Sequence, residues 1–323
     1  MFSNIYKRAN TDWLANCKYG IGFHWTAETT PRYGSPLSFK DATERFNLDR
    51  FIEAVEKSGA YYVIFTITHA FQMFPCPHPV VDLILPGRTS ERDLLGEIIT
   101  ELHKRNKYFI AYYNHSCNNF GEDPEWQIAV GYHDRCKRKL VKNLCNIVGY
   151  IGKKYGKMLD GWWFDSCYAL DPRGPSNTVT TDMNRFFFPW EKFTRYAKSG
   201  YEERLVTYNA GVSQRYLYTS HQDYWAGELI NLDDRPKGRY LPSGLQWQGW
   251  LCLDNREWVH KRLNTDAQDP LYTDEELFDF VSHCVKFNAP VCFNVEIFQD
   301  GTVSSKAVEQ LSRLGKYLKQ DIT

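Results

Sequence analysis

The sequence has no excess charge of either sign and no long apolar run. Lysine plus arginine number 39, and so do aspartate plus glutamate, so the formal net charge is zero. A balanced charge of this kind indicates no electrostatic footprint for nucleic acid or for an anionic membrane surface. No stretch approaches the ~18 apolar residues of a membrane-spanning helix. We therefore expect neither a nucleic-acid nor a membrane partner.

Regularly spaced cysteines and histidines are also missing. The nine cysteines are odd in number and contain no C-x-x-C pair, which argues against a disulfide framework or zinc ribbon and favours reduced thiols. The spacings H-x-H and H-E-x-x-H of metalloenzymes do not occur, so we expect no metal ion and no cofactor. The first residues, MFSNIYKRANTDW, lack the roughly 7–15 apolar residues of a signal peptide. The expected location is the cytoplasm, or the periplasm or exterior if a signal has been trimmed.

Hydrophobic residues are plentiful, at 43% of the chain, which is enough for a large buried core and argues against disorder. A length of 323 residues fits one large α/β barrel or two ordinary domains. There is no linker, low-complexity tract or internal repeat, so one domain over residues 1–323 is the simpler prediction. Aromatic residues reach 16%. Most will pack in the core, but tryptophan also suits stacking on sugar rings.

Short apolar runs alternate with helical periods along the whole chain. Leu48, Phe51, Ile52 and Val55 follow helical spacing, and Gly59 supplies a stop. Further helices are predicted at 90–102, where Ser90 and Asp93 form a cap and first turn, and at 134–155, 183–198, 274–286 and 308–318. Runs rich in β-branched and aromatic residues predict eight strands, at 19–26, 61–68, 107–114, 159–166, 204–210, 223–228, 245–252 and 290–296.

This alternation predicts an α/β fold in which parallel strands are joined by helical crossovers. About eight strands in 320 residues favour closure into a (β/α)₈, TIM-like barrel. The alternative is an open doubly wound sheet. That fold calls for a glycine-rich turn after its first strand, where this chain has Phe23-His24-Trp25.

Polar and aromatic residues recur where the predicted strands end, which is where barrel enzymes place their active sites. The strand-end residues are His24 and Trp25, His69, Tyr113, Asn114 and His115, Asp165, Asn209, Glu228, and Asn294 and Glu296. In the run Gly161-Trp162-Trp163-Phe164-Asp165, alternation places Trp163 and Asp165 on one side of the strand.

Asp165 and Glu228 are the two carboxylates that strands deliver to the predicted barrel mouth. Each has a structural alternative: Asp165 as the cap of the following loop, Glu228 as a member of a salt bridge. Two carboxylates at one mouth are what glycosidic cleavage requires, one as nucleophile and one as general acid and base. The histidines His24 and His69 are then candidate ligands of sugar hydroxyls, although a lone strand-end histidine is more often structural.

Several motifs, in order, resemble those of the family 29 glycoside hydrolases, the α-L-fucosidases. The family's F-G-I-F-I-H-W-G is similar to Tyr19–Trp25, its A-G-A-K-Y to Ser58–Tyr62, and its R-D-L-x-G-E to Arg92–Glu97. The remaining similar segments are His69 with Ala70 and Phe71 for K-H-H-D-G-F, Ile110–Asn114 for G-L-Y-Y-S, Asp160–Asp165 for P-D-x-x-W-F-D, Asp223–Glu228 for D-x-x-x-A-E, and Asn288–Asn294 with Asp300–Gly301 for the closing motif.

The resemblance covers about residues 17–318 and implies a barrel that hydrolyses a terminal α-L-fucosyl or related sugar by double displacement. It implies Asp165 as nucleophile and Glu228 as acid/base. The expected sugar contacts are His24, Trp25, His69, Tyr113, Trp163, Asn209 and Trp225. Three features depart from the family pattern: Ala70 replaces a second histidine, Asn209-Ala210-Gly211 lacks an arginine, and the given sequence ends where the family's C-terminal β-sandwich would begin, so we expect a single barrel domain without it.

The sequence thus predicts a retaining exo-α-glycosidase with a carbohydrate substrate. Two other hypotheses remain open. One is a non-catalytic sugar-binding barrel, which keeps the pocket without turnover; the other is a barrel hydrolase that acts on non-sugars.

Overall fold

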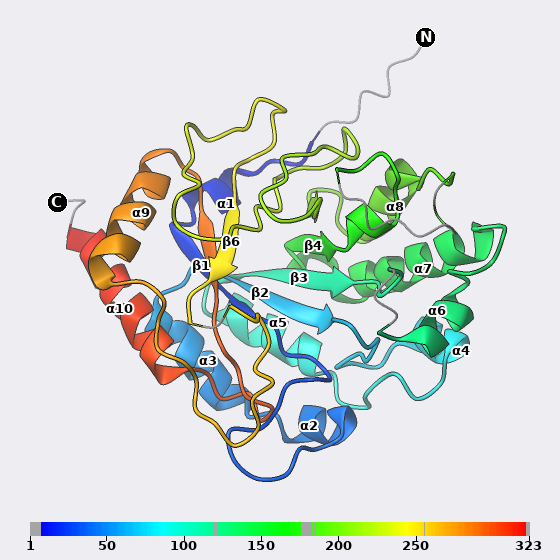
Figure 1. The fold of residues 1–323 in the computed structure, drawn as a ribbon, viewed down its shortest axis with the longest axis horizontal. Coiled ribbons are helices and arrows are strands. Elements are labelled where there is room, and N and C mark those ends of the chain that lie inside the picture. Colours follow the sequence, from blue (N-terminus) through cyan, green and yellow to red (C-terminus); the bar gives the residue numbers. More distant parts are fainter. Residues whose placement is uncertain (1–7, 119–121, 176–182, 184, 255, 321–323) are drawn as a thin grey trace.

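The computed structural model describes residues 8–118, 122–175, 183, 185–254 and 256–320 (Figure 1). Its strands are β1 (Tyr19–Phe23), β2 (Tyr62–Thr68), β3 (Tyr108–Asn114), β4 (Gly161–Asp165), β5 (Leu205–Tyr208), β6 (Gly249–Cys252) and β7 (Val291–Asn294). Its helices are α1 (Asp12–Asn16), α2 (Phe39–Arg45), α3 (Leu48–Ser58), α4 (Pro79–Ile84), α5 (Leu94–Lys104), α6 (Pro124–Val130), α7 (Arg138–Tyr155), α8 (Trp190–Ala197), α9 (Asp274–Lys286) and α10 (Ser305–Gln320). Short 3₁₀ turns, η1 (Gly156–Met158) and η2 (Cys167–Ala169), flank β4.

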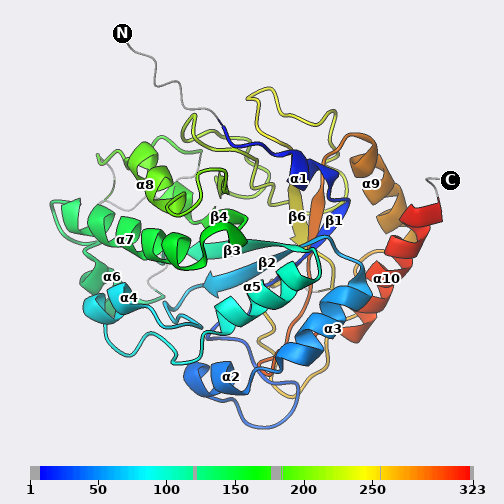
Figure 2. The same ribbon diagram turned by 180° about the vertical axis from the view of Figure 1, so that it is seen from behind.

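The strands form one parallel sheet in the order β5-β4-β3-β2-β1-β7-β6. The sheet curls, and helices α3, α5, α7 and α10 cover its outer face (Figures 1 and 2). This confirms the prediction of a TIM-like α/β fold. The chain's first and last thirds meet where β1 pairs with both β2 and β7.

The sixth expected strand, at 223–228, is not a regular strand. The segment makes only isolated bridges, from Tyr224 to Gln246 and from Glu228 to Trp250, and on its other side the Asp223 amide donates to the Val206 carbonyl at 2.9 Å. Gly227 explains the irregularity, because its φ of +61° departs from extended geometry. A Cβ there would meet the Gln248 carbonyl oxygen at 1.7 Å, so glycine permits this close approach. The segment closes the gap between β5 and β6 through irregular hydrogen bonds.

Local sequence signals account for most helix ends. Helix α3 is capped by Asn47 and ends at Gly59, which has the left-handed φ of +74°. Helix α9 begins with a complete capping box formed by Thr273 and Glu276. Helix α5 begins later than expected. Its N-cap is Asp93, whose side chain accepts from the Gly96 amide, and not Ser90. The helix expected from 183 begins only at Trp190, and residue 184 lies outside the described residues.

Two groups of buried side chains divide the interior. The larger group fills the space between sheet and helices. The smaller lies inside the curled sheet, and its strand members alternate along each strand: Tyr62 and Ile64, Ile110 and Tyr112, Trp163, Leu205, Trp250 and Cys292. Period-two alternation therefore decides which residues face the barrel interior.

Glycines in β1 make room for these inward-facing rings. A Cβ on Gly20 would lie 2.5 Å from the Tyr62 ring, and one on Gly22 would lie 2.7 Å from Nε1 of Trp250. Rings from neighbouring strands thus occupy the volume that side chains of β1 would otherwise take. No helix in the described part of the chain is long and apolar enough to cross a membrane.

We predict that Gly20→Ala destabilises the fold by about 1–3 kcal/mol, because the added methyl overpacks a closely filled interior. The control is Gly238→Ala, since a Cβ there has only the Tyr240 carbonyl oxygen nearby, at 4.0 Å. The control should change stability by less than about 0.5 kcal/mol. Urea unfolding measures both values, and equal effects would show that the Tyr62 contact does not constrain position 20.

Candidate active site

Residues at the carboxyl ends of the strands meet in a pocket with an empty volume of about 350 Å³. Its lining comes from the ends of five strands, from η2, from the irregular segment that ends at Glu228 and from the loop before residue 260. The lining residues are His24, His69, Tyr112, Trp163, Asp165, Tyr168, Glu228, Trp250 and Trp258. Aromatic rings form most of the wall, and the two carboxylates are its only acidic groups.

Asp165 ends β4 and is held by donors from neighbouring strands. Its Oδ2 accepts from the Tyr112 hydroxyl at 2.5 Å and from Nδ2 of Asn114 at 3.1 Å. Its Oδ1 accepts from Nδ2 of Asn209 at 2.9 Å. These three hydrogen bonds fix the orientation of the carboxylate.

Asn209 connects the two carboxylates. The same Nδ2 that donates to Asp165 also donates to Oε2 of Glu228 at 2.7 Å, so these two carboxylate oxygens lie no more than about 5.6 Å apart. The orientation of the amide is fixed, because its Oδ1 accepts from the Gly211 backbone amide at 3.0 Å. The backbone amide of Asn209 donates in turn to Phe164 at 2.8 Å, which ties the residue to the end of β4.

Glu228 titrates differently from an ordinary glutamate. Burial, followed by the nearby Asp165 carboxylate, raises the pKa of Glu228 to about 7, although the Asn209 hydrogen bond acts in the opposite direction. Two adjacent carboxylates rarely both ionise at low cost, so one keeps its proton near neutral pH. Glu228 therefore keeps its proton to a higher pH than an ordinary glutamate does.

The two expected histidines also line the pocket. Nδ1 of His24 donates to Oδ1 of Asn294 at 2.7 Å, while Nδ2 of Asn294 donates to the Trp258 carbonyl at 2.8 Å, which sets the direction of that amide. Burial, followed by the neighbouring His69, lowers the pKa of His24 to about 3, so its ring is neutral and Nε2 remains an acceptor. Burial also lowers the pKa of His69.

Four of the expected sugar contacts do not line the pocket: Asn209, which is buried behind the two carboxylates it joins, and Trp25, Tyr113 and Trp225. Trp25 packs against Phe39 and Phe46, with ring centroids 5.0 and 5.2 Å away, and its indole N–H donates to Gln299. Tyr113 points to the helix side of β3, as an odd-numbered residue of that strand must. Trp225 packs against Trp247 and donates to the Gln214 carbonyl, so neither tryptophan lines the pocket.

The pocket instead uses rings that sequence reasoning missed: Tyr112, Tyr168, Trp250 and Trp258. Alternation could have found Tyr112, since it shares the inward side of β3 with Asn114. Trp250 is the register partner of Cys292, which faces inward on β7, so alternation along the strand could have predicted its inward direction too. Tyr168 and Trp258 lie in loops, where no periodicity predicts the direction of a side chain.

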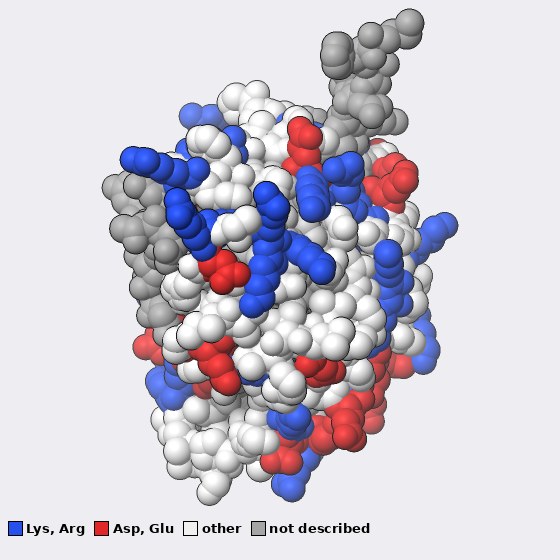
Figure 3. All heavy atoms as spheres, turned by 90° about the vertical axis from the view of Figure 1, so that its right-hand side faces the viewer, with Lys and Arg blue, Asp and Glu red and all other residues white. Residues whose placement is uncertain are grey.

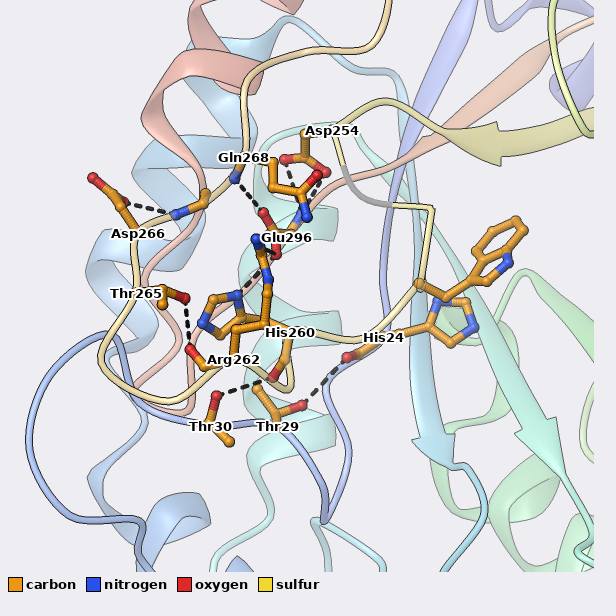
Figure 4. A network of polar contacts seen from close by, with 12 residues as sticks. His24, Thr29, Thr30, Asp254, His260, Arg262, Thr265, Asp266, Gln268 and Glu296 are labelled. Atoms are coloured by element: carbon orange, nitrogen blue, oxygen red, sulfur yellow. Dashed lines mark hydrogen bonds and ion pairs between the residues drawn. The ribbon is translucent and has the colours of Figure 1, made fainter.

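A buried polar network anchors the loop that carries Trp258 (Figure 4). Glu296 has no exposed surface, and its carboxylate accepts from three groups of that loop. The donors are Nδ1 of His260 at 2.8 Å, the Arg262 guanidinium at 2.5 Å and the Gln268 amide at 2.6 Å. The carboxylate of Glu296 thus points away from the pocket and into this network, so it is not a second candidate acid.

Asp254 completes the network. Both of its carboxylate oxygens accept from the Glu296 backbone amide at 3.1 Å. Burial, followed by the Glu296 charge, raises the pKa of Asp254 to about 8. A proton on Asp254 at neutral pH avoids two adjacent buried charges. Among the described residues, no group of three or more His, Cys, Asp or Glu side chains is arranged to hold a metal ion.

A parallel TIM-like barrel with two joined carboxylates in an aromatic pocket at its carboxyl end defines a glycoside hydrolase. A family model described as alpha-L-fucosidase matches residues 38–322, and the chain belongs to this family. A comparison with curated proteins gives no match.

Solved structures with the same fold include two kinds of enzyme. The endo-fucoidan hydrolase MfFcnA4 of glycoside hydrolase family 107 has a TM-score of 0.69 at 14% identity, and the match covers 97% of this chain and 54% of that one. The family 107 enzyme P5AFcnA has a TM-score of 0.68 at 12% identity, covering 97% and 95%. The α-L-fucosidase AlfC from Lactobacillus casei, in complex with α-L-fucose, has a TM-score of 0.63 at 16% identity, covering 97% and 99%. The chain thus spans about half of MfFcnA4 and nearly all of the other two.

We predict that Glu296→Gln lowers the free energy of unfolding by about 3–5 kcal/mol, because it leaves the buried His260 imidazole and the half-buried Arg262 guanidinium without their charged acceptor. Amide hydrogen exchange over residues 256–268 should also accelerate, since Glu296 anchors this loop. The matched control is Glu309→Gln, whose surface pair with Lys57 contributes about 0–1 kcal/mol. Similar losses for both variants would contradict the anchoring role.

Proposed function

We propose that this protein is a retaining exo-α-glycosidase that removes a terminal α-L-fucosyl or closely related residue. The observation that supports this most directly is the Asn209 amide joined to both Asp165 and Glu228. Retaining glycosidases hold their carboxylates about 5–5.5 Å apart, and the bound of about 5.6 Å between the two joined oxygens is compatible with that spacing. Inverting enzymes need a wider gap to admit a water molecule.

In the first step the Asp165 carboxylate attacks the anomeric carbon, and the bond from that carbon to the leaving oxygen breaks. Glu228 gives its proton to the leaving oxygen, which its raised pKa allows near neutral pH. In the second step the ionised Glu228 takes a proton from water, and the water oxygen displaces Asp165. Tyr112 and Asn114 hold the Asp165 carboxylate in place during both steps.

The shape and charge of the pocket favour one neutral sugar ring. Its volume suits a single pyranose better than a continuous chain, and its wall offers the rings of Trp163, Trp250 and Trp258 for stacking. No lysine or arginine is among the pocket-lining residues. His24 and His69 are the candidate ligands of the sugar hydroxyls.

The departures from the family pattern concern specificity. Ala70 is buried and does not line the pocket, and the two residues directly after Asn209 are Ala210 and Gly211, neither of which is an arginine. Arg235 pairs with Asp279 and Arg239 with Asp12, so neither replaces the missing donor. A buried hydroxyl that lacks a partner costs about 1–3 kcal/mol. Comparing kcat/KM on aryl α-L-fucoside and aryl α-L-galactoside tests which sugar is preferred. Release of nitrophenol from either substrate distinguishes an enzyme from a non-catalytic sugar-binding barrel.

For Asp165 we predict that the Asn variant loses activity on aryl glycosides by on the order of 10³-fold or more, because it removes the nucleophile. The fold and the binding of free sugar, measured by a shift in melting temperature, should remain. Azide should restore turnover to Asp165→Gly by occupying the vacant position. Retention of a tenth of the wild-type rate by Asp165→Asn would overturn the assignment.

For Glu228 we predict a dependence on both pH and leaving group. Because the general acid must carry its proton, kcat/KM on a poor leaving group should fall as pH rises through about 7. Glu228→Ala should abolish this alkaline limb and slow poor leaving groups by roughly 10²–10⁴-fold. Glycosylation by activated nitrophenyl substrates should suffer far less, since they depart without protonation. Equal losses on both substrates would indicate a structural role.

A further inference from the structure

A second hollow lies between the starts of α7 and α8 and is lined by cations and phenylalanines. Its empty volume is about 1100 Å³. Three exposed cations line it, Arg135, Arg138 and Lys192, together with Phe186 and Phe187. We call this hollow the basic groove. On the face in Figure 3, lysine and arginine side chains gather in the upper half.

These cations do not serve the stability of α7. The helix contains no acidic residue, and its first turns carry Arg138, Lys139 and Lys142. Cations near a helix N-terminus oppose the helix dipole, and like charges four residues apart repel. None of these three, nor Arg135 or Lys192, forms an ion pair with another residue in the described part of the chain. In a protein with zero net charge, this local excess favours an anionic ligand.

The aromatic component narrows the chemistry of that ligand. The side chain of Phe187 is 62% exposed, and the Arg173 guanidinium lies 4.9 Å from its ring centroid. An exposed ring beside guanidinium groups offers stacking for the apolar face of a sugar and charged hydrogen bonds for its acidic substituents. Lysines alone would suit any polyanion, but an exposed phenylalanine ring among arginines favours a carbohydrate.

The basic groove lies on the same side of the barrel as the pocket. Arg135 precedes α7 in the connection that follows β3, and Phe187 precedes α8 in the connection that follows β4. Tyr168, which lines the pocket, belongs to the latter connection. The two sites differ in charge: the pocket has carboxylates and no lysine or arginine, so acidic substituents are disfavoured there and accepted in the groove.

We propose that the basic groove binds an acidic carbohydrate chain, with Arg135, Arg138 and Lys192 contacting its sulfate or carboxylate groups and Phe187 packing on a sugar ring. The choice of a carbohydrate rests on the proposed glycosidase function. The groove then selects glycans that are acidic away from the sugar cleaved in the pocket.

Cys136 provides a direct measurement, because it lines the groove and is the one exposed thiol among the nine cysteines. Its alkylation by neutral iodoacetamide is followed by mass spectrometry with and without polymer. Dextran sulfate should slow the reaction at least fivefold at low salt, and unsulfated dextran should not. Raising the salt to about 1 M should abolish protection, since the screening length falls to about 3 Å. Polygalacturonate in place of dextran sulfate distinguishes carboxylate from sulfate recognition.

The test variant is Arg138→Glu combined with Lys192→Glu, and the charge-matched control is Lys316→Glu combined with Lys319→Glu on α10. Comparing rates with and without polymer within each variant cancels changes in the thiol's own reactivity. The groove variant should lose protection, and the control should keep it. Protection that survives in the groove variant, or that duplex DNA gives at lower concentration than either acidic polysaccharide, would overturn the proposal.

These measurements distinguish failure of the basic-groove proposal from failure of the proposed glycosidase function. The Asp165→Asn protein should show full protection, because the footprint does not require turnover. If aryl glycosides are hydrolysed but acidic polysaccharides give no protection, only the basic groove is wrong. Protection without hydrolysis of any aryl glycoside would instead contradict the enzymatic assignment alone.

Discussion

The inward-facing residues of the parallel strands compete for a narrow space, and the rest of the molecule is arranged around how that space is filled. Large rings from β2, β3, β4 and β6 occupy it, and β1 contributes glycines opposite Tyr62 and Trp250. Because the interior is tightly filled, the residues at the carboxyl ends of the strands have little conformational freedom. The side chains that follow the rings, Asn114 and Asp165 among them, therefore emerge at one end in fixed directions.

Burial at that end creates the chemical asymmetry of the site. Asp165 receives three donors, while Glu228 receives the Asn209 amide and faces the Asp165 charge. Burial and the Asp165 charge raise the pKa of Glu228, so its surroundings hold its proton to a higher pH than an ordinary glutamate would. The single amide between them has both of its N–H groups committed, and the Gly211 backbone prevents it from turning. This geometry arises from contacts between β4, β5 and the irregular segment that contains Glu228.

The loops at the carboxyl end of the barrel supply an aromatic wall of the pocket and part of the positively charged basic groove. The Glu296 network fixes the loop that carries Trp258, so an aromatic wall is built on a segment without regular secondary structure. The basic groove is formed by the connections before α7 and α8 and by the first turns of those helices, and none of its cations lines the pocket with the carboxylates. Carboxylates in the pocket and cations in the basic groove are thus kept apart in a chain whose total charge is zero.

Periodicity along the chain was sufficient to predict the main helices, the positions of Asp165 and Glu228, and every strand apart from the irregular segment 223–228. Each of these features depends on residues that are neighbours in the sequence. The same alternation that placed Asp165 inward would have selected Tyr112 over Tyr113. It could not show that Trp25 and Trp225 pack into the core, since a ring after a strand can turn either way. The shared amide of Asn209, the raised pKa of Glu228 and the Trp258 wall were decided only by the tertiary structure. Each of these depends on distances between residues far apart in the chain, and a sequence pattern carries no such distances.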